Sequence, residues 1–570
     1  MTRNFPQTVV LGFDALSFRY LDAFELPNFE SLRARGVESR LRATFPPWTG
    51  SAWPSMYTGT EPGHHGAYSF FDFADRYPDD AELVSRNTVR APAIWDYLSE
   101  DEIESIVLNV PVTHPAKPIH GTLVPGYLAP EDATGYPASI RAELDEALGE
   151  PYRIYLEDEV EDGNGIEALC SLLRLRGRAG VHLLETREWE FAFLQFQKTD
   201  TVFHRFDDEE AFRRVYEAAD DVVGDILDTV DEEANVVVCS DHGIGPTTGY
   251  NVYLNEILRQ HGYVEASSEG RTPTLTEGKA NLTDGSTGGE TTGESTDTTG
   301  SGQSPTEGAT GDANSAAGPR SITNRALSAA VAGLWRAGIT PGDVYAASAR
   351  IGLDGALKRL LPDDVTSAVG QHVDWRASTA YCRTGPELGI RLNLQGREEN
   401  GVVPETEYEQ VREDLIELLS ALETPDGESV FEWVRRREAV YDGPQADAAC
   451  DVLFLPSKMN HLIATNLLGR QFVPLDQFNH KQEGVFIGAG PGFDTGARIE
   501  EISLDDVAPI VMGVLGRDVP ARMTGSVPEG MLVEPVGRRV YDVDVQVESN
   551  ETPREDRAAV ESRLEDLGYL

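Results

Sequence analysis

The stretch Thr8-Val-Val-Leu-Gly-Phe13 is a short apolar run that ends directly before Asp14. A run of this length and composition is typical of a strand that is buried on both faces of a parallel sheet. Three further runs of the same kind follow along the chain, at residues 105–111, 190–196 and 235–240. Helical patterns separate these runs, so the sequence predicts an α/β fold with a mainly parallel sheet and helices on both faces.

Local patterns also predict elements outside these four strands. Residues 26–36 favour a helix with Gly36 just beyond its end, and residues 166–187, 405–422 and 503–515 favour further helices. Residues 377–394 indicate a pair of strands. Two more runs, at residues 451–455 and 483–487, indicate further strands of the core.

Composition divides the chain into segments. Residues 1–264 form the first part of the predicted core, with residues 126–190 as a candidate insertion. Gly, Thr, Ser and acidic residues dominate residues 265–320, where large apolar residues nearly vanish, so we expect a disordered linker. The remaining segments are a helical segment with an insertion subdomain at 321–440, the second part of the core at 441–530, and a tail at 531–570. A capping box from Thr552 to Glu555 predicts a helix within that tail.

The chain is strongly acidic, with 96 Asp and Glu residues against 48 Lys and Arg residues and a formal net charge of −48. Lysine is rare, and arginine supplies most of the positive charge. Such a composition is typical of a halophilic protein, because high salt screens the repulsion between carboxylates. An ordinary acidic protein with an acidic linker is the alternative. The charge argues against binding of nucleic acid through its phosphates, which requires a basic groove.

The four cysteines are scattered without CxxC spacing, which indicates neither a disulfide framework nor a thiolate metal site. The N-terminus leads straight into a predicted strand without an apolar signal-peptide region. No stretch approaches the roughly 18 uncharged apolar residues of a membrane span. We therefore expect a soluble cytoplasmic protein, and the sequence leaves its oligomeric state open.

Acids and histidines lie next to the ends of several predicted strands. Asp14 follows the first strand, Asp200 and His204 follow the third, and Asp241 and His242 follow the fourth. Because the carboxyl ends of parallel strands meet at one edge of a sheet, these side chains could converge there. Asp200 and His204 would share one face of a helix if a helix starts at that point.

A further histidine, His480, lies just before the run 483–487. Carboxylates mixed with imidazoles suit Zn²⁺ or Mn²⁺ better than soft metals. Each of these residues, taken alone, also has an interpretation that involves no metal ion. An Asp after a strand is often a helix cap, Asp-His-Gly is often a loop, and Asp and His one helical turn apart can be a solvated pair.

Thr49 lies in a stretch dense in proline, glycine and small hydroxyl residues, from Phe45 to Gly66. We expect the backbone to turn sharply more than once there. A hydroxyl in such a stretch is an ordinary feature on its own. Thr49 becomes a candidate functional residue because acids and histidines recur elsewhere in the chain at spacings suited to metal ligation.

In this order, the motifs resemble those of the alkaline phosphatase superfamily, in the branch of type I phosphodiesterases and nucleotide pyrophosphatases. The resemblance spans roughly residues 8 to 490 apart from the linker. It rests on Gly12-Phe-Asp14, Thr49 with Thr58-Gly-Thr-Glu-Pro-Gly-His-His-Gly66, Asp200-xxx-His204, Asp241-His-Gly243 and His480-xxx-Gly484. It implies an alkaline-phosphatase-like, doubly wound, mainly parallel sheet with insertions.

The resemblance also implies roles for single residues. One divalent ion would be held by Asp14, Asp241, His242 and the Thr49 oxygen, and a second by Asp200, His204 and His480. The ions would be Zn²⁺, with Mn²⁺ as the alternative. Thr49 would be the nucleophile that attacks a small phosphorylated substrate and forms a phosphothreonine intermediate. The chemistry agrees, because coordination to a divalent ion lowers the pKa of a hydroxyl that is otherwise a weak nucleophile.

The sequence departs from the family pattern at one place. Nucleotide pyrophosphatases carry an asparagine after the nucleophile that helps to hold a phosphoryl oxygen, and residues 66–72 contain none. Ser69 and Lys198 are candidates to replace it, and nucleotide selectivity is not implied. We expect His65 to support the site or a turn rather than to bind metal.

Several alternatives stay open. The enzyme alternatives are a phosphomonoesterase and a transferase of phosphoryl or head groups from the same superfamily. In another class, the chain could be a catalytically inactive metal- or ligand-binding protein of the same fold. A sulfatase is disfavoured, because residues 49–53 lack the required Cys or Ser followed by Pro-x-Arg.

Overall fold

The computed structural model describes residues 7–73, 77–78, 81–156, 165–267 and 372–545. All of these residues belong to one compact unit of the chain. The predicted linker, the predicted helical segment that follows it and the predicted C-terminal helix lie wholly or almost wholly outside the described residues. No helix within the described ranges is long and apolar enough to cross a membrane.

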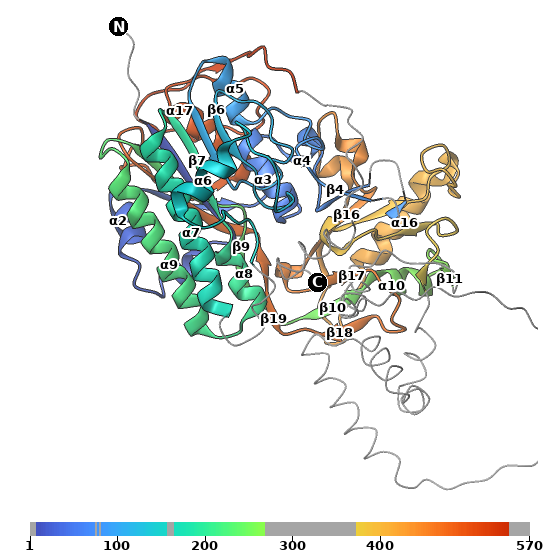
Figure 1. Cartoon of the computed structure of the whole chain (residues 1–570). Helices are drawn as coiled ribbons and strands as arrows, with labels where there is room; N and C mark the ends of the chain where they lie inside the picture. The colour runs from blue at the N-terminus through green and yellow to red at the C-terminus, as the bar shows by residue number, and fades with distance from the viewer. Residues whose placement is uncertain (1–6, 74–76, 79–80, 157–164, 268–371, 546–570) are drawn as a thin grey trace, which may run out of the picture. The chain divides into compact units, whose positions relative to one another are not determined.

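The core of this unit is an eight-stranded sheet with the strand order β21-β2-β20-β8-β1-β7-β5-β6 (Figure 1). Its pairs are parallel except for the two that β20 makes, with β2 and with β8. The mainly parallel sheet that we predicted is therefore confirmed. The strands have these bounds: β1 Thr8–Phe13, β2 Gly36–Arg42, β5 Ser105–Leu108, β6 Gly121–Val124, β7 Phe191–Phe196, β8 Asn235–Ser240, β20 Glu483–Ala489 and β21 Glu501–Ser503.

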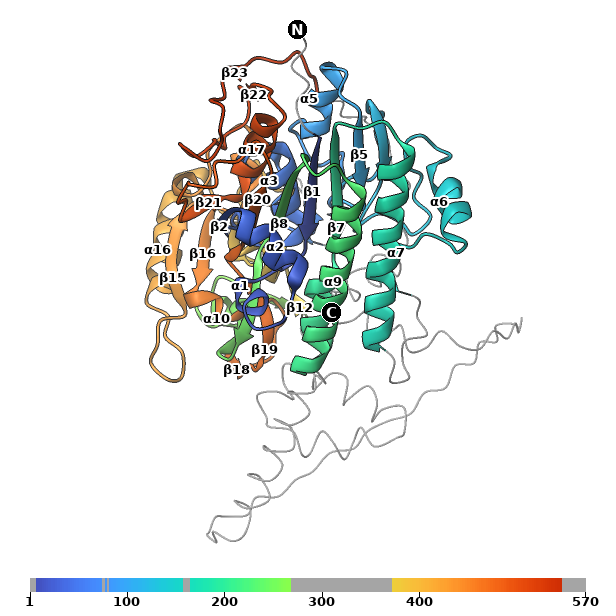
Figure 2. The ribbon, with the colours of Figure 1, turned by 90° about the vertical axis from the view of Figure 1, so that its left-hand side faces the viewer.

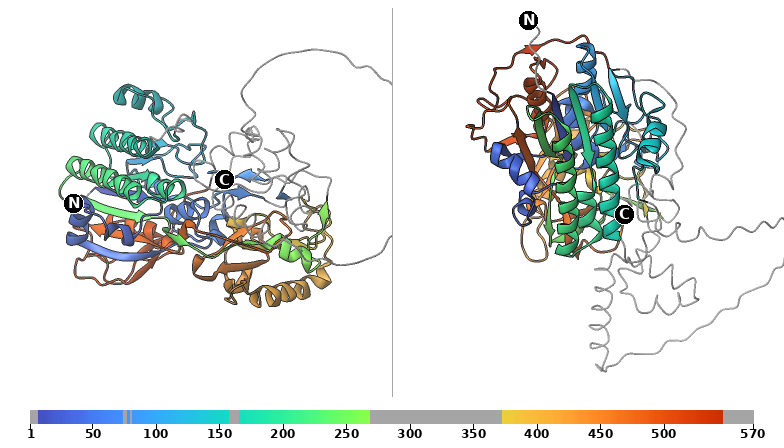
Figure 3. Two further views of the ribbon diagram at one scale, coloured as in Figure 1. Left: turned by 90° about the horizontal axis from the view of Figure 1, so that it is seen from below. Right: turned by 60° about the vertical axis from the view of Figure 1, so that its left-hand side comes forward.

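Long helices cover one face of this sheet. Helix α7 (Gly165–Thr186) packs on β7 and β5, and α9 (Glu209–Thr229) lies beside α7 (Figure 2). Helix α2 (Pro27–Arg35) packs on α9 and β20. The helices form a layer beside the strands (Figure 3). Helix α7, residues 165–186, is part of this layer and lies within the range 126–190 that we named as a candidate insertion.

The opposite face of the sheet is covered by α3 (Thr49–Thr58). Gly12 of β1 makes this packing close, because a Cβ atom there would lie 2.6 Å from the Trp53 ring. Helix α17 (Val507–Val514) packs on α3. The prediction of helices on both faces is thus confirmed. The stretch from Phe45 to Gly66, which we expected to turn repeatedly, instead carries two helices, α3 and α4 (Pro62–His65).

Gly36 ends α2 as predicted, but without a left-handed turn. Its φ is −123°, and it is already the first residue of β2. A Cβ atom at this position would lie 2.5 Å from the Gly488 carbonyl oxygen and 2.8 Å from that of Leu32. Close approach of backbone, rather than a positive φ, therefore requires glycine here. The sequence pattern did not reveal β2, which follows the helix without a break.

A second, four-stranded sheet has the order β13-β14-β16-β15. Its strands are β13 (Ala380–Tyr381), β14 (Gly389–Leu392), β15 (Phe431–Arg436) and β16 (Val452–Pro456), and α16 (Tyr408–Ser420) packs on β15 and β16. The predicted strand pair at 377–394 is confirmed as β13 and β14. Strand β16 lies within residues 441–530, which we predicted as the second part of the core, and it pairs with β14 and β15.

The described residues also form shorter strands and helices. Strand β10 (Tyr250–Tyr253) lies between β17 (Leu462–Ala464) and β18 (Phe472–Pro474), and α10 (Leu254–Gln260) follows it. Strands β9 (Gly243–Thr247) and β19 (Gln477–Lys481) form an antiparallel pair. Helix α8 (Lys198–Arg205) follows β7. Further helices among the described residues are α1 (Phe18–Leu21), α5 (Ile94–Glu100) and α6 (Ile140–Leu148).

The excess of 48 negative charges predicts a stability that depends on salt. Raising KCl from about 0.1 M to about 1 M shortens the Debye length from about 10 Å to about 3 Å and weakens repulsion between the surface carboxylates. We expect the melting temperature to rise by several degrees over this range, as measured by differential scanning fluorimetry. An uncharged osmolyte at the same osmolality is the control. A melting temperature that stays level or falls in KCl would argue against a halophilic protein.

Candidate metal centre

Three carboxylates lie at the carboxyl edge of the main sheet. Asp14 and Asp241 follow β1 and β8, which are neighbours in the sheet, and Asp200 lies in the first turn of α8, directly after β7. The Thr199 hydroxyl donates a hydrogen bond of 2.6 Å to the Asp14 carbonyl oxygen and ties α8 to the end of β1. All three carboxylates are fully buried. The parallel topology therefore brings them together, as the sequence predicted.

Asp14, Asp241 and His242 form the first group. The His242 Nε2 atom lies 3.4 Å from Asp14 Oδ1 and 3.3 Å from Asp241 Oδ2. The Nδ1 atom of the same ring lies 3.0 Å from the Gly243 carbonyl oxygen, so it carries the proton and donates. Nε2 therefore faces the carboxylates and is the ring nitrogen that a metal ion would bind in place of a proton.

Backbone donors orient Asp241 within this group. Its Oδ1 atom accepts hydrogen bonds from the amides of Ala15, at 3.2 Å, and His242, at 3.0 Å. Ala15 reaches this position with φ of +56°, a left-handed conformation that costs a residue with a Cβ atom about 1 kcal/mol or more. Strain in the backbone is thus accepted directly beside the site, and the Asp241 Oδ2 atom is left to face His242.

Asp200, His204 and His480 form the second group. Asp200 and His204 share one face of α8, with Asp200 Oδ1 3.1 Å from His204 Nε2. His480 Nε2 lies 3.6 Å from the same Asp200 oxygen. His480 lies inside β19 rather than in a loop before a strand, and its Nδ1 donates a 3.0 Å hydrogen bond to the Pro47 carbonyl oxygen. Both His242 and His480 are therefore fixed through Nδ1 to a backbone carbonyl.

The two groups adjoin each other. The rings of His242 and His480 stack with their centroids 3.6 Å apart. One ligand atom from each of Asp14, Asp241 and His242 lies within 4.8 Å of the others, and the same holds for Asp200, His242 and His480. His242 thus lies between the groups, whereas His204 joins the second group through Asp200. The geometry is compatible with two neighbouring ions.

Thr49 is the first residue of α3 and is fully buried. The preceding residues touch the second group, because the Trp48 ring lies 4.6 Å from the His480 ring and Pro47 accepts its hydrogen bond. Thr49 Oγ1 and Asp200 Oδ2 are buried atoms that make no hydrogen bond to any residue in the described ranges. Unpaired buried oxygens are costly, and metal ions at this place would satisfy them. The residues therefore fit a metal centre.

Electrostatics support the same conclusion. Burial raises the pKa of both Asp14 and Asp241. Burial lowers the pKa of His242, but Asp241 and Asp14 outweigh this effect and raise it to about 10. Burial together with His242 and His204 holds the pKa of His480 well below its usual range. Metal-free, this cluster of buried acids is unfavourable, and divalent cations would stabilise their ionised forms.

Two side chains that we did not single out from the sequence support Asp14. Asn109 Nδ2 donates to the backbone carbonyl oxygen of Gln195 at 3.2 Å and to its Oε1 atom at 2.8 Å. Gln195 Nε2 in turn donates to Asp14 Oδ2 at 3.5 Å. Asn109 directly follows β5 with φ of +63°. Asn109 follows an apolar strand, as Asp14 does. The sequence pattern that indicated Asp14 could therefore have indicated Asn109 as well.

His65 has a structural role, in agreement with the prediction. Its Nδ1 atom accepts a hydrogen bond from the Ala67 amide at 3.2 Å, and its Nε2 atom lies 2.9 Å from Ser55 Oγ. Both nitrogens are thus used within the turn that joins α4 to α3, and burial lowers the His65 pKa to about 3. Ser69 lies against the start of α3, because a Cβ atom on Gly50 would be 2.5 Å from the Ser69 carbonyl oxygen.

Comparison with family models identifies the chain. Residues 8–296, about half of the sequence, match the family described as type I phosphodiesterase / nucleotide pyrophosphatase. The chain belongs to this family. The type I phosphodiesterase family match supports a hydrolase of phosphoric esters, and it covers the metal-centre residues except His480. A comparison with curated proteins gave no match.

The solved structures that match this chain include the following two. Phosphonoacetate hydrolase from Sinorhizobium meliloti 1021, in complex with phosphonoformate, has 14% sequence identity and a TM-score of 0.49. That likeness covers 90% of this type I phosphodiesterase-family chain and 96% of the other. Human ectonucleotide pyrophosphatase / phosphodiesterase 5 has 12% identity and a TM-score of 0.45, covering 93% and 100% of the respective chains. At these values, neither structure says what this chain acts on.

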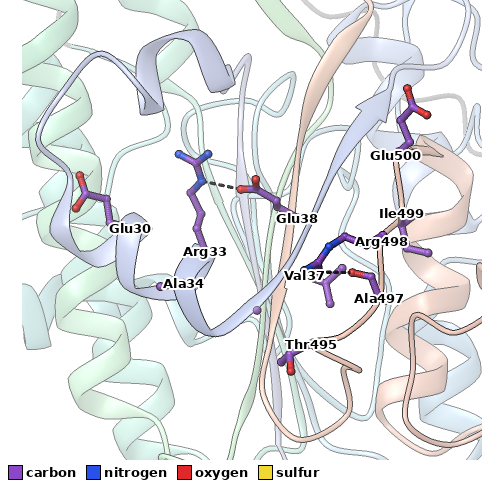
Figure 4. Close-up of a pocket in the computed structure, with 11 residues that line it drawn as sticks. Glu30, Arg33, Ala34, Val37, Glu38, Thr495, Ala497, Arg498, Ile499 and Glu500 are labelled. Atoms are coloured by element: carbon purple, nitrogen blue, oxygen red, sulfur yellow. Dashed lines mark hydrogen bonds and ion pairs between the residues drawn. The ribbon is translucent and has the colours of Figure 1, made fainter.

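A surface cleft of about 850 Å³ contains none of the candidate metal ligands in its lining. Figure 4 shows the side chains that line it. It is bounded by α2, the start of β2 and the segment 495–500. Gly36 pairs with Ala489, which also pairs with Val236 near the start of β8. The cleft is therefore at the amino edge of the sheet, opposite the edge that carries Asp14 and Asp241. It takes no part in the chemistry of that site.

Proposed function

We propose that this chain is a metal-dependent hydrolase of phosphodiesters or nucleotide pyrophosphate bonds that uses Thr49 as its nucleophile. The observation that carries the proposal is the buried Thr49 hydroxyl at the start of α3, which has no hydrogen-bond partner in the described part of the chain. It directly follows Pro47 and Trp48, which contact His480 in the buried cluster of acids and histidines. A hydroxyl at a helix N-terminus is also well placed to act on an anion, because free backbone amides point toward it.

The proposed metal ligands follow the two groups of side chains. Asp14, Asp241, His242 and Thr49 would hold one ion, and Asp200, His204 and His480 the other. A donor set of carboxylates and imidazoles suits Zn²⁺, with Mn²⁺ as the alternative. When bound, the ions lower the pKa of the Thr49 hydroxyl and neutralise charge on the phosphoryl oxygens.

The protein residues then act in two steps. Thr49 Oγ1 loses its proton and attacks phosphorus, the bond to the leaving alcohol or phosphate breaks, and that leaving group takes up a proton, so that a threonine-linked phosphoryl group results. Water then attacks the same phosphorus, the bond to Thr49 Oγ1 breaks, and the hydroxyl regains its proton. The backbone carbonyls of Pro47 and Gly243 keep His480 and His242 in the tautomer that this site needs throughout.

An assay with two model esters tests the proposal. We expect the protein, purified in high salt and loaded with Zn²⁺ or Mn²⁺, to hydrolyse bis(p-nitrophenyl) phosphate faster than p-nitrophenyl phosphate. The opposite preference would favour a phosphomonoesterase. Transfer of the phosphoryl group to an added alcohol, in excess over transfer to water, would favour a transferase. Metal binding without turnover of either ester would favour a catalytically inactive binding protein.

A further inference from the structure

Polar side chains cross the carboxyl edge of the main sheet beyond the proposed metal ligands. In the order β8, β1, β7 and β5, the strands are followed or ended by Asp241, Asp14, Gln195 with Gln197, and Asn109. The first two strands are thus followed by carboxylates, and the next two end in or are followed by amides, with Asp200 of α8 coming after the amides at the end of β7. All six side chains are buried, so the amides belong to the interior of the same site region.

The Gln195 amide faces α3. Gly12 of β1 and Gln195 of β7 are paired in the parallel ladder, so their side-chain directions point to the same face of the sheet. That face is the one that α3 covers, because a Cβ atom on Gly12 would lie 2.6 Å from Trp53. Asp14 lies on this side too, because its Oδ2 atom accepts a hydrogen bond from Gln195 Nε2, and Gln197 follows two residues after Gln195, just beyond the end of β7. The Gln195 amide is therefore on the side of the sheet that carries Thr49.

The orientation of the Gln197 amide is fixed by Lys198. The Lys198 ammonium lies 3.0 Å from Gln197 Oε1, and an ammonium can only donate. The Gln197 oxygen must therefore face the lysine, and its NH₂ group must point away. This Nε2 atom is fully buried and has no hydrogen-bond partner among the residues that the structure describes.

An unsatisfied buried donor next to a reaction centre needs an acceptor. An amide NH₂ group cannot bind a metal ion, so the ions of the proposed centre would not satisfy it. The neighbouring Gln195 does not satisfy it either, because the Gln195 amide oxygen accepts from Asn109, its NH₂ group donates to Asp14, and Gln197 Nε2 makes no hydrogen bond to it. The ammonium of Lys198, fully buried beside this amide, adds positive charge that favours an anionic acceptor.

We propose that Gln197 Nε2 donates a hydrogen bond to a phosphoryl oxygen of the substrate, with Lys198 holding the amide in the required orientation. The inference rests on the proposed function, since it concerns the same site. Its role is to bind and orient the anionic group just beyond the end of β7, where the Asp200 amide donates a hydrogen bond to the Gln197 carbonyl oxygen. The acceptor is an unesterified oxygen, which phosphomonoesters, phosphodiesters and pyrophosphates all carry.

Gln197→Glu is the decisive variant, because it keeps an oxygen for Lys198 and replaces only the donor by an acceptor. We expect kcat/KM for bis(p-nitrophenyl) phosphate to fall roughly 10- to 100-fold, as for loss of one donor to a reacting oxygen. Metal content and melting temperature should stay at wild-type values. Gln197→Met is the second variant, because methionine has a similar length, no donor and no carboxylate that could perturb metal loading. It should show the same loss of kcat/KM at wild-type metal content.

Gln7→Glu is the matched control. Gln7 lies before β1 at the amino edge of the same sheet, where its Nε2 atom donates to the Trp189 carbonyl oxygen at 2.9 Å. We expect this variant to keep kcat/KM within twofold of the wild type. Wild-type kcat/KM in both Gln197→Glu and Gln197→Met would overturn the inference while leaving the proposed function intact.

Phosphate binding separates the inference from the proposed function. Inorganic phosphate is titrated by calorimetry into the metal-loaded protein and into metal-loaded Gln197→Met. We expect roughly tenfold weaker binding in the variant. If the wild type turns over no ester, the proposed hydrolysis fails, but weaker phosphate binding in the variant still supports the Gln197 contact. Equal affinities would overturn it in either case.

Discussion

Replacing Thr49 with alanine is expected to reduce turnover about ten-thousand-fold or more while both metal ions remain bound. Loss of a nucleophile removes the covalent route altogether, and effects of this size are typical for such residues. Six of the seven proposed ligands are unchanged in the variant, so metal affinity should be mostly kept. The measurements are kcat for bis(p-nitrophenyl) phosphate and metal content by inductively coupled plasma mass spectrometry.

Thr58→Ala is the matched control for this experiment. Thr58 is a buried threonine at the other end of α3, where its hydroxyl donates to the Pro54 carbonyl oxygen at 2.6 Å. The same atoms are thus removed from the same helix, away from the acids and histidines. We expect activity within a few-fold of wild type. Undiminished turnover in Thr49→Ala would show that another group attacks phosphorus and would end the proposed mechanism.

Removing metal with a chelator is expected to abolish activity and to lower the melting temperature. Three fully buried carboxylates then lose the cations that neutralise them, and their ion pairs in the structure are with histidines. At a free metal concentration of about 1,000 times Kd, each occupied site stabilises the folded state by about 4 kcal/mol. Adding Zn²⁺ or Mn²⁺ back should restore both properties. Activity assays and scanning calorimetry measure them.

The variant Asp200→Ala tests whether the second group binds an ion of its own. This residue contacts both histidines of the second group, so the variant should bind one ion fewer and gain less stability from added metal. The first group should keep its ion, because its three side chains are unchanged. Full activity after exhaustive chelation, or an unchanged metal content in Asp200→Ala, would contradict a two-metal centre built from these residues.

The sequence predicted the fold and the positions of the acids well, for a physical reason. Parallel strands that are buried on both faces appear as short apolar runs, and their carboxyl ends coincide at one edge. Asp14 and Asp241 could therefore be placed together without knowledge of any contact. Asp200 and His204 could be placed on one helical face by spacing alone, and the structure confirms that placement.

Other features depend on contacts that no local pattern encodes. Strand β16 has the same apolar character as the core strands, and only its pairing with β14 and β15 assigns it to the smaller sheet. His480 is brought to Asp200 by the pairing of β19 with β9. The support of Asp14 by Gln195 and Asn109 joins residues far apart in sequence, as does the hydrogen bond from His480 to Pro47.

The central claim is that Thr49 becomes covalently bound to the phosphoryl group, and trapping that species tests it most directly. The metal-loaded enzyme is mixed with excess ester, quenched in acid within the first turnover, digested and analysed by tandem mass spectrometry. The account predicts a phosphoryl adduct on Thr49 that is absent from Thr49→Ala. Steady turnover without any adduct at Thr49, or an adduct on a different residue, would contradict it.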